Sequence, residues 1–219
     1  MRPGPGAFIG VAAVATAALT GSLIQRRADT HVVGAGFWFD QVTYDVPALE
    51  GRGGPLYDSE RATVREVARQ ELRQAFAGWR LEITDNPRAH YRVRVMQRFG
   101  ETRMRRFGVA ESRSLGPLGG DGAVSFSALA RIAVTLAPTG TTRPLVVEAI
   151  GRGLGRVAAH ELAHQIVPRH NLHASADPSS YDFDDVNRVS QFYGPVRWDL
   201  ARPRLEEALG LSVATGARR

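Results

Sequence analysis

The 219-residue sequence predicts a mixed α/β (α+β) domain in which helices pack behind a twisted sheet. Apolar residues recur at helical spacing in residues 58–79 and 141–167, which indicates two amphipathic helices. Shorter apolar segments with the composition of strands precede these helices, and stretches rich in glycine and proline separate them. With 43% hydrophobic and 23% charged residues, the chain has the composition of a globular domain with a substantial core.

Each element has a local signal of its own. We expect strands near residues 37–44, 81–84, 91–97, 123–127 and 132–136. In the third of these, arginines alternate with valines, which is the pattern of a strand with one buried and one solvated face. Asp58 or Ser59 can cap the helix that runs to Trp79. Two further helices are expected near residues 184–192 and 202–211.

The helix centred near residue 153 has recognisable ends. Pro144 is typical of the first turn of a helix, and Pro168 disfavours helical geometry at the residue before it. Its interior contains Gly151, Gly153 and Gly155, and a glycine inside a helix costs about 1 kcal/mol. These glycines indicate either a shortened helix or close packing against a sheet.

The stretch from His160 to His170 contains the residues that could bind a metal ion and activate water. His160 and His164 stand four residues apart, so a helix presents both imidazoles on one face, about one turn apart. Glu161 follows the first histidine directly, where its carboxylate can hold and deprotonate a water molecule. His170 would complete a site of three nitrogens with one open position, which is the arrangement of catalytic zinc.

This segment resembles the HExxHxxGxxH zinc signature of the metzincin metallopeptidases, and its surroundings are most similar to the matrixin branch. Residues 173–180 resemble the matrixin run that leads into the Met-turn, and residues 184–194 resemble the closing helix, which ends in Tyr-Gly. The resemblance extends over residues 36–195. It implies a metzincin-like zincin domain, with a twisted mixed sheet, a zinc-site helix and a C-terminal helix.

The resemblance also implies a function, that of a zinc-dependent endopeptidase which hydrolyses peptide bonds through a metal-activated water. Glu161 would be the general base. The ligands of one catalytic Zn²⁺ would be His160, His164 and His170. An extended protein or peptide substrate is expected to pair with a strand on the rim of the cleft. The residues assigned to substrate binding in this way are Val124, Ser125 and Phe126.

Three departures from the matrixin pattern concern the metal site. Val167 replaces the glycine at which the chain turns after the second histidine. The Met-turn methionine is missing, because all three methionines precede the motif, and Tyr181 stands near its place as a candidate supporting residue. Residues 91–159 contain no histidine, so the structural zinc of the family is not expected, and a structural calcium stays open.

The net charge of +6 comes from arginine alone, because none of the 28 basic residues is lysine. The exclusive use of arginine is better explained by a compositional bias of the source genome than by a role in binding a polyanion. The densest cluster, residues 88–106, has few interleaved aromatic residues, so no nucleic-acid partner is expected. Two alternatives stay open, a catalytically inactive zinc-binding protein of the zincin fold and a basic nucleic-acid-binding module. The absence of cysteine excludes disulfides and thiolate metal sites.

The first 27 residues form a separate element of the sequence. An apolar stretch from Ala7 to Ile24 lies between Arg2 and a pair of arginines, and its first half lacks a polar face. We interpret residues 1–27 as an export signal or membrane anchor, 28–195 as the catalytic domain and 196–219 as a C-terminal extension. The protein would then be secreted, periplasmic or membrane-anchored, with its catalytic domain outside the cytoplasm. This segment could contact a membrane, and the protein is expected to be a monomer.

Overall fold

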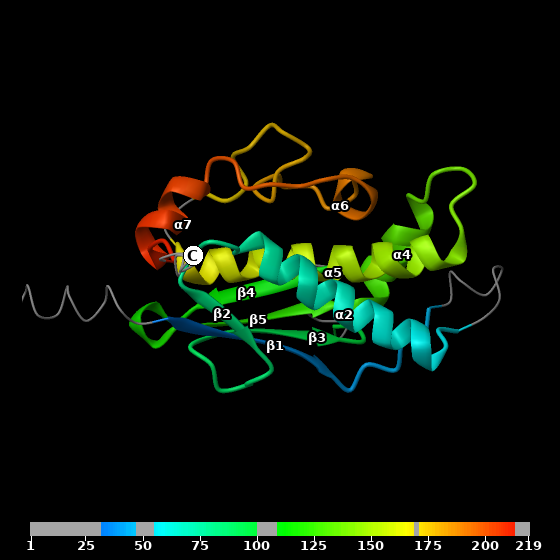
Figure 1. The fold of residues 1–219 in the computed structure, drawn as a ribbon, viewed down its shortest axis with the longest axis horizontal. Coiled ribbons are helices and arrows are strands. Elements are labelled where there is room, and N and C mark those ends of the chain that lie inside the picture. Colours follow the sequence, from blue (N-terminus) through cyan, green and yellow to red (C-terminus); the bar gives the residue numbers. More distant parts are fainter. Residues whose placement is uncertain (1–31, 47–54, 100–108, 169–170, 213–219) are drawn as a thin grey trace, which may run out of the picture. The chain divides into compact units, whose positions relative to one another are not determined.

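The computed structural model of the protein describes residues 32–46, 55–99, 109–168 and 171–212, and its elements confirm a mixed α/β fold (Figure 1). The strands are β1 (Val33–Asp40), β2 (Leu81–Thr84), β3 (Tyr91–Met96), β4 (Ala110–Ser114) and β5 (Gly120–Ser125). The helices are α2 (Asp58–Ala75), α4 (Phe126–Thr135), α5 (Arg143–Ile166), α6 (Ser190–Tyr193) and α7 (Arg202–Leu209). A short 3-10 helix, η2 (Gly116–Leu118), lies between β4 and β5.

The described strands form one five-stranded sheet in the order β2-β1-β3-β5-β4. Neighbouring strands are parallel from β2 through β5, whereas β4 pairs antiparallel with β5. The inner strands carry fully buried side chains, among them Phe37, Val93 and Val124. β4 lies at one edge of the sheet, so its outer side pairs with no described strand.

Helices α2 and α5 lie side by side over the sheet (Figure 1), and glycines allow their close approach. A Cβ atom at Gly155 would stand 2.3 Å from the backbone oxygen of Ala68 in α2. A Cβ atom at Gly153 would stand 2.3 Å from the ring of Phe192. Helix α5 nevertheless runs unbroken for 24 residues. The glycines therefore do not shorten α5, and they serve contacts with α2 and Phe192 rather than with the sheet.

The strand expected at residues 132–136 is wrong, because helix α4 occupies this region. The Ser125 hydroxyl caps α4 by accepting a hydrogen bond from the N–H of Ala128 at 3.3 Å. The buried side chains of α4 recur at helical spacing, and they are Phe126, Leu129, Ala130 and Ala133. This cap and this apolar face outweigh the strand preference of the β-branched residues in the segment.

The region after residue 195 belongs to the core rather than to an appended extension. The Trp198 indole N–H donates to the carbonyl of Ala75 at the end of α2, at 2.7 Å. Leu205 and Leu209 of α7 are buried in the same hydrophobic core. The boundary expected at residue 196 therefore does not end the domain. The closing helix expected over residues 184–192 is reduced to the short α6.

The alternation expected for residues 91–97 is confirmed in β3. Its two valines are fully buried, whereas its arginines are partly exposed. Arg92 lies 3.6 Å from the carboxylate of Asp121, and Arg94 lies 3.8 Å from that of Asp40. Neighbouring carboxylates thus offset part of the positive charge on this face.

The predicted signal or anchor, residues 1–27, lies outside the described residues. Within the described ranges, no helix has both the length and the apolar character that a membrane crossing requires.

Candidate metal centre

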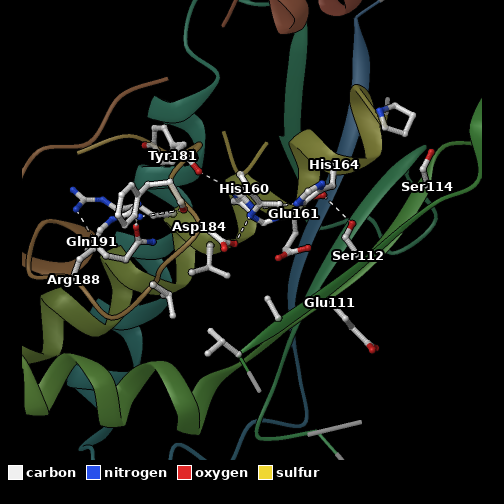
Figure 2. Close-up of a pocket in the computed structure, with 18 residues that line it drawn as sticks. Glu111, Ser112, Ser114, His160, Glu161, His164, Tyr181, Asp184, Arg188 and Gln191 are labelled. Atoms are coloured by element: carbon white, nitrogen blue, oxygen red, sulfur yellow. Dashed lines mark hydrogen bonds and ion pairs between the residues drawn. The ribbon is translucent and has the colours of Figure 1, made fainter. Parts of the chain in front are cut away.

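Helix α5 presents His160 and His164 to a cleft (Figure 2). Their Nε2 atoms lie 3.0 Å apart and their ring centroids 4.7 Å apart. This proximity follows from their positions one helical turn apart. The pairing expected from the sequence is confirmed.

A third imidazole comes from His173, in the loop after α5. Its ring centroid lies 5.0 Å from those of both His160 and His164. One nitrogen from each ring lies within 4.8 Å of the others. Nitrogens bound at about 2.1 Å to one ion lie about 3–4 Å apart, so small side-chain movements would close this group around a metal. Three histidines of the described residues could therefore hold a metal ion.

The third ligand predicted from the sequence, His170, lies outside the described residues. Among the described residues, His173, three positions further along the chain, stands beside the helical pair. The sequence shows His173 as plainly as His170, but the metzincin spacing favours His170. Which histidine returns to the helix depends on the path of the chain after Pro168, and spacing within the helix carries no information about that path.

Hydrogen bonds at Nδ1 orient two of the three rings. Nδ1–H of His160 donates to the carbonyl oxygen of Tyr181 at 2.6 Å. Nδ1 of His173 lies 2.7 Å from Oδ1 of Asp184. When Nδ1 carries the proton, the lone pair remains on Nε2. Both rings can therefore offer Nε2 to a metal ion.

The environment of the helical pair favours neutral imidazoles. Burial, and secondly the neighbouring His164, lower the pKa of His160 to about 3. Burial and the nearby His173 lower the pKa of His164 to about 4. Neutral imidazoles have the free lone pair that metal binding requires, so these two need not release a proton at neutral pH.

Glu161 is a buried carboxyl beside this group, with 8% of its surface exposed. Burial, and secondly the negative charge of Glu111, raise the pKa of Glu161 to about 8. In the metal-free protein its carboxyl group therefore binds a proton near neutral pH. A carboxyl with such a pKa is suited to transfer protons at neutral pH.

The three histidines and Glu161 line a cavity of about 540 Å³. In Figure 2, Ser112 and Ser114 of β4 lie on one side of the histidine pair, and Asp184, Arg188 and Gln191 lie on the other. A cavity of this size accommodates a small ligand or a few side chains. The imidazoles can thus be reached from between the edge strand and the loop that follows α5.

Val124, Ser125 and Phe126, which were expected to bind an extended substrate, are not among the residues that line the cavity. All three residues are buried. β5 pairs with β3 on one side and with β4 on the other, so its backbone groups are already used. The strand that borders the cavity is β4, which was not expected from the sequence. Whether a strand is interior or at an edge depends on the whole sheet.

Partly buried hydrogen bonds of Ser112 and Gln165 join β4 to α5. The Ser112 hydroxyl donates to the carbonyl of Glu161 at 2.9 Å, and the Gln165 side-chain amide donates to the Ser112 hydroxyl at 3.2 Å. The Gln165 amide also donates to the carbonyl of Arg92 in β3, and its oxygen accepts from the Arg92 N–H, at 3.0 and 3.1 Å. Gln165 thus joins helix α5 to both β3 and β4.

Tyr181, the candidate supporting residue, acts through its backbone and packs through its ring. Its carbonyl accepts the hydrogen bond from His160, and its ring lies 4.6 Å from that of Trp198. Burial raises the pKa of its hydroxyl to about 12, so the phenol stays protonated. The described contacts of Tyr181 are thus a backbone hydrogen bond with His160 and ring packing against Trp198.

No family model and no curated protein matches this chain. The site itself offers three clustered imidazoles, one buried carboxyl and an accessible cavity between an edge strand and a loop.

Proposed function

We propose that the protein is a zinc-dependent endopeptidase. The observation that carries this proposal is the buried carboxyl of Glu161 beside three imidazoles that line an open cavity. Structural zinc sites are closed by four protein ligands, whereas catalytic sites have three and an open position. His160, His164 and His173 fit the second type, and neutral nitrogen ligands suit zinc.

The proposed chemistry divides between the ion and the protein. When bound, zinc would supply Lewis acidity, which lowers the pKa of a water molecule and polarises a peptide carbonyl. Glu161 takes the proton of the attacking water on a carboxylate oxygen and passes it to the leaving amine nitrogen. The hydrogen bonds of His160 and His173 at Nδ1 hold their rings in place during this transfer.

We propose that the outer side of β4 binds the substrate backbone. An extended peptide can add to an exposed sheet edge through main-chain hydrogen bonds. Ala110, Ser112 and Ser114 of β4 line the cavity beside the histidines, so a peptide there would pass the metal site. The metzincin resemblance supports this proposal, because it implies a substrate paired with a strand at the cleft rim.

Hydrolysis of a mixed peptide library by the zinc-loaded protein tests the proposed function. We expect a chelator to abolish cleavage and added zinc to restore it. Glu161→Gln is expected to retain zinc but to cleave about 10²–10⁴-fold more slowly, because the proton acceptor is lost. Mass spectrometry of the products measures both rates.

A matched control is Glu148→Gln, a partly exposed glutamate of the same helix that pairs with Arg152. This variant is expected to cleave like the wild type. Equal cleavage by wild type and Glu161→Gln would overturn the proposal. A wild type that binds zinc without cleaving any peptide would instead support a zinc-binding protein without peptidase activity.

A further inference from the structure

The three imidazoles are held by different parts of the structure. His160 and His164 stand on the long helix α5, whose backbone fixes their spacing. His173 stands in the loop between α5 and α6, and its side chain is 43% exposed. Neither a helix nor tight burial fixes the His173 ring, so its orientation depends on a specific side-chain partner.

Asp184 is that partner. Its Oδ1 lies 2.7 Å from Nδ1 of His173, within the range of a charge-assisted hydrogen bond. This bond keeps the proton on Nδ1 and leaves Nε2 for a metal ion. In Figure 2, Asp184 lies beside His160, on the opposite side of the site from Ser112. It therefore approaches the imidazoles from the loop rather than from the sheet.

Arg188 in turn fixes the backbone on both sides of Asp184. Its guanidinium donates to the carbonyl oxygens of Phe183 at 3.2 Å and of Asp185 at 2.8 Å. It also donates to the carbonyl of Ser180 at 2.6 Å. A planar guanidinium with five donors can bridge several carbonyls at once, whereas an ammonium group is a single point. The loop that carries Asp184 is thereby held at both flanking peptide groups.

We propose that Asp184 is the positioning residue of the third metal ligand, His173, and that Arg188 holds Asp184 in place. This inference rests on the metal site of the proposed function, but it does not require peptide hydrolysis. A carboxylate bonded to a metal-binding imidazole fixes the ring and makes it a stronger ligand. Loss of such a partner typically weakens metal affinity 10–100-fold.

Zinc affinity, measured by competition with a chromogenic chelator, tests the proposal. We expect Asp184→Ala to bind zinc about 10–100-fold more weakly than the wild type. Asp184→Asn is expected to lose less, because its amide oxygen still accepts a hydrogen bond from Nδ1–H. Arg188→Lys is expected to fall between wild type and Asp184→Ala, since lysine cannot bridge the three carbonyls.

Cobalt substitution supplies a readout that general destabilisation would not produce. The visible absorption of bound Co²⁺ reports the number of its ligands and their geometry. We expect Asp184→Ala to change this spectrum, because the third imidazole is no longer held. We expect Asp184→Asn to retain most of the wild-type spectrum.

Asp185→Asn is the matched control, because it removes the same charge from the adjacent residue. Oδ1 of Asp185 bonds to the N–H of Asn187 at 2.7 Å, and an asparagine can keep this bond. This variant is expected to bind zinc like the wild type. Circular dichroism of the metal-free variants checks folding. If Asp184→Ala does not fold, the inference is tested instead by comparing the zinc affinity of Asp184→Asn with that of Asp185→Asn.

Two results would overturn the inference. They are wild-type affinity and spectrum in Asp184→Ala, and an equal loss of affinity in Asp185→Asn. A wild type that binds no metal would overturn both this inference and the proposed function. If zinc affinity depends on Asp184 but the wild type cleaves no peptide, the proposed function alone is overturned.

Discussion

At the scale of single residues, one buried carboxyl and two partly buried imidazoles make the stability of the metal-free protein depend on pH. The pKa values of His160 and His164 are lowered from 6.5 to about 3 and about 4, so stability falls as pH drops below 6.5. The pKa of Glu161 is raised from 4.5 to about 8, so stability falls as the pH rises from 4.5 to about 8. Between pH 4.5 and 6.5 the two histidines outweigh the one glutamate, which places the maximum from these groups near pH 6.5.

Glu161→Gln should therefore remove the loss of stability that this group causes as the pH rises toward 8. Metal-free wild type is expected to lose about 1–2 kcal/mol of unfolding free energy from this group between about pH 6.5 and about pH 8. The variant has no carboxyl to ionise and should lose none from this position. Urea denaturation in the presence of a chelator measures both profiles, and the difference between them cancels the other titrating groups. Parallel profiles would contradict the raised pKa.

At the scale of the elements, the contact between α2 and α5 depends on glycine. A Cβ atom at Gly155 would stand 2.3 Å from the backbone oxygen of Ala68, which cannot move without moving α2. Gly155→Ala gains about 1 kcal/mol of helix propensity, but overpacking of this kind costs about 1–3 kcal/mol. A clash with backbone belongs at the upper end of that range, so we expect a net loss of about 1–2 kcal/mol in denaturant unfolding.

Gly34→Ala in β1 is the control for this substitution. The nearest atom to a Cβ at Gly34 is the Cβ of Ala89, at 3.9 Å, which is an ordinary contact. This variant is expected to be as stable as the wild type or slightly more stable, because alanine reduces the freedom of the unfolded chain. A Gly155→Ala variant as stable as Gly34→Ala would show that the two helices have room to separate.

Elements and site residues were predictable from the sequence where their signals are local. Pro144 and Pro168 bound the metal-site helix as expected, because capping and proline geometry act within one turn. His160, Glu161 and His164 follow from helical spacing alone. The same local signals mislead at residues 132–136, where β-branched residues suggest a strand but the Ser125 cap and an apolar face form a helix.

The remaining features depend on contacts between distant segments. Which strand borders the cavity, β4 rather than β5, depends on the order of the strands in the sheet, and the residue pattern within either strand does not reveal that order. The third imidazole poses a similar problem, because spacing along the chain does not reveal that His173 lies beside the helical pair. Asp184 has no sequence signal at all, since its role appears only when the loop returns to α5.

At the scale of the whole molecule, a metal ion would join the core helix α5 to the loop of residues 171–189. Helix α5 is packed against α2 and the sheet, whereas this loop has no helix or strand of its own. A ligand that binds only the folded protein at about 100 times its Kd adds about 3 kcal/mol of stability. The gain should be greatest where local opening breaks the metal site, which is in the loop.

Zinc should therefore protect residues 171–189 from hydrogen exchange more than it protects the strands. Mass spectrometry of zinc-loaded and chelator-treated protein is expected to show exchange in this loop slowed about 10-fold or more by zinc. In His173→Ala the helical pair can still bind zinc weakly, but the loop should exchange at the same rate with and without the ion. His170→Ala is the matched control and should keep the wild-type protection. The reverse result, with protection lost in His170→Ala and kept in His173→Ala, would assign the third ligand to His170 and contradict the arrangement of the described site.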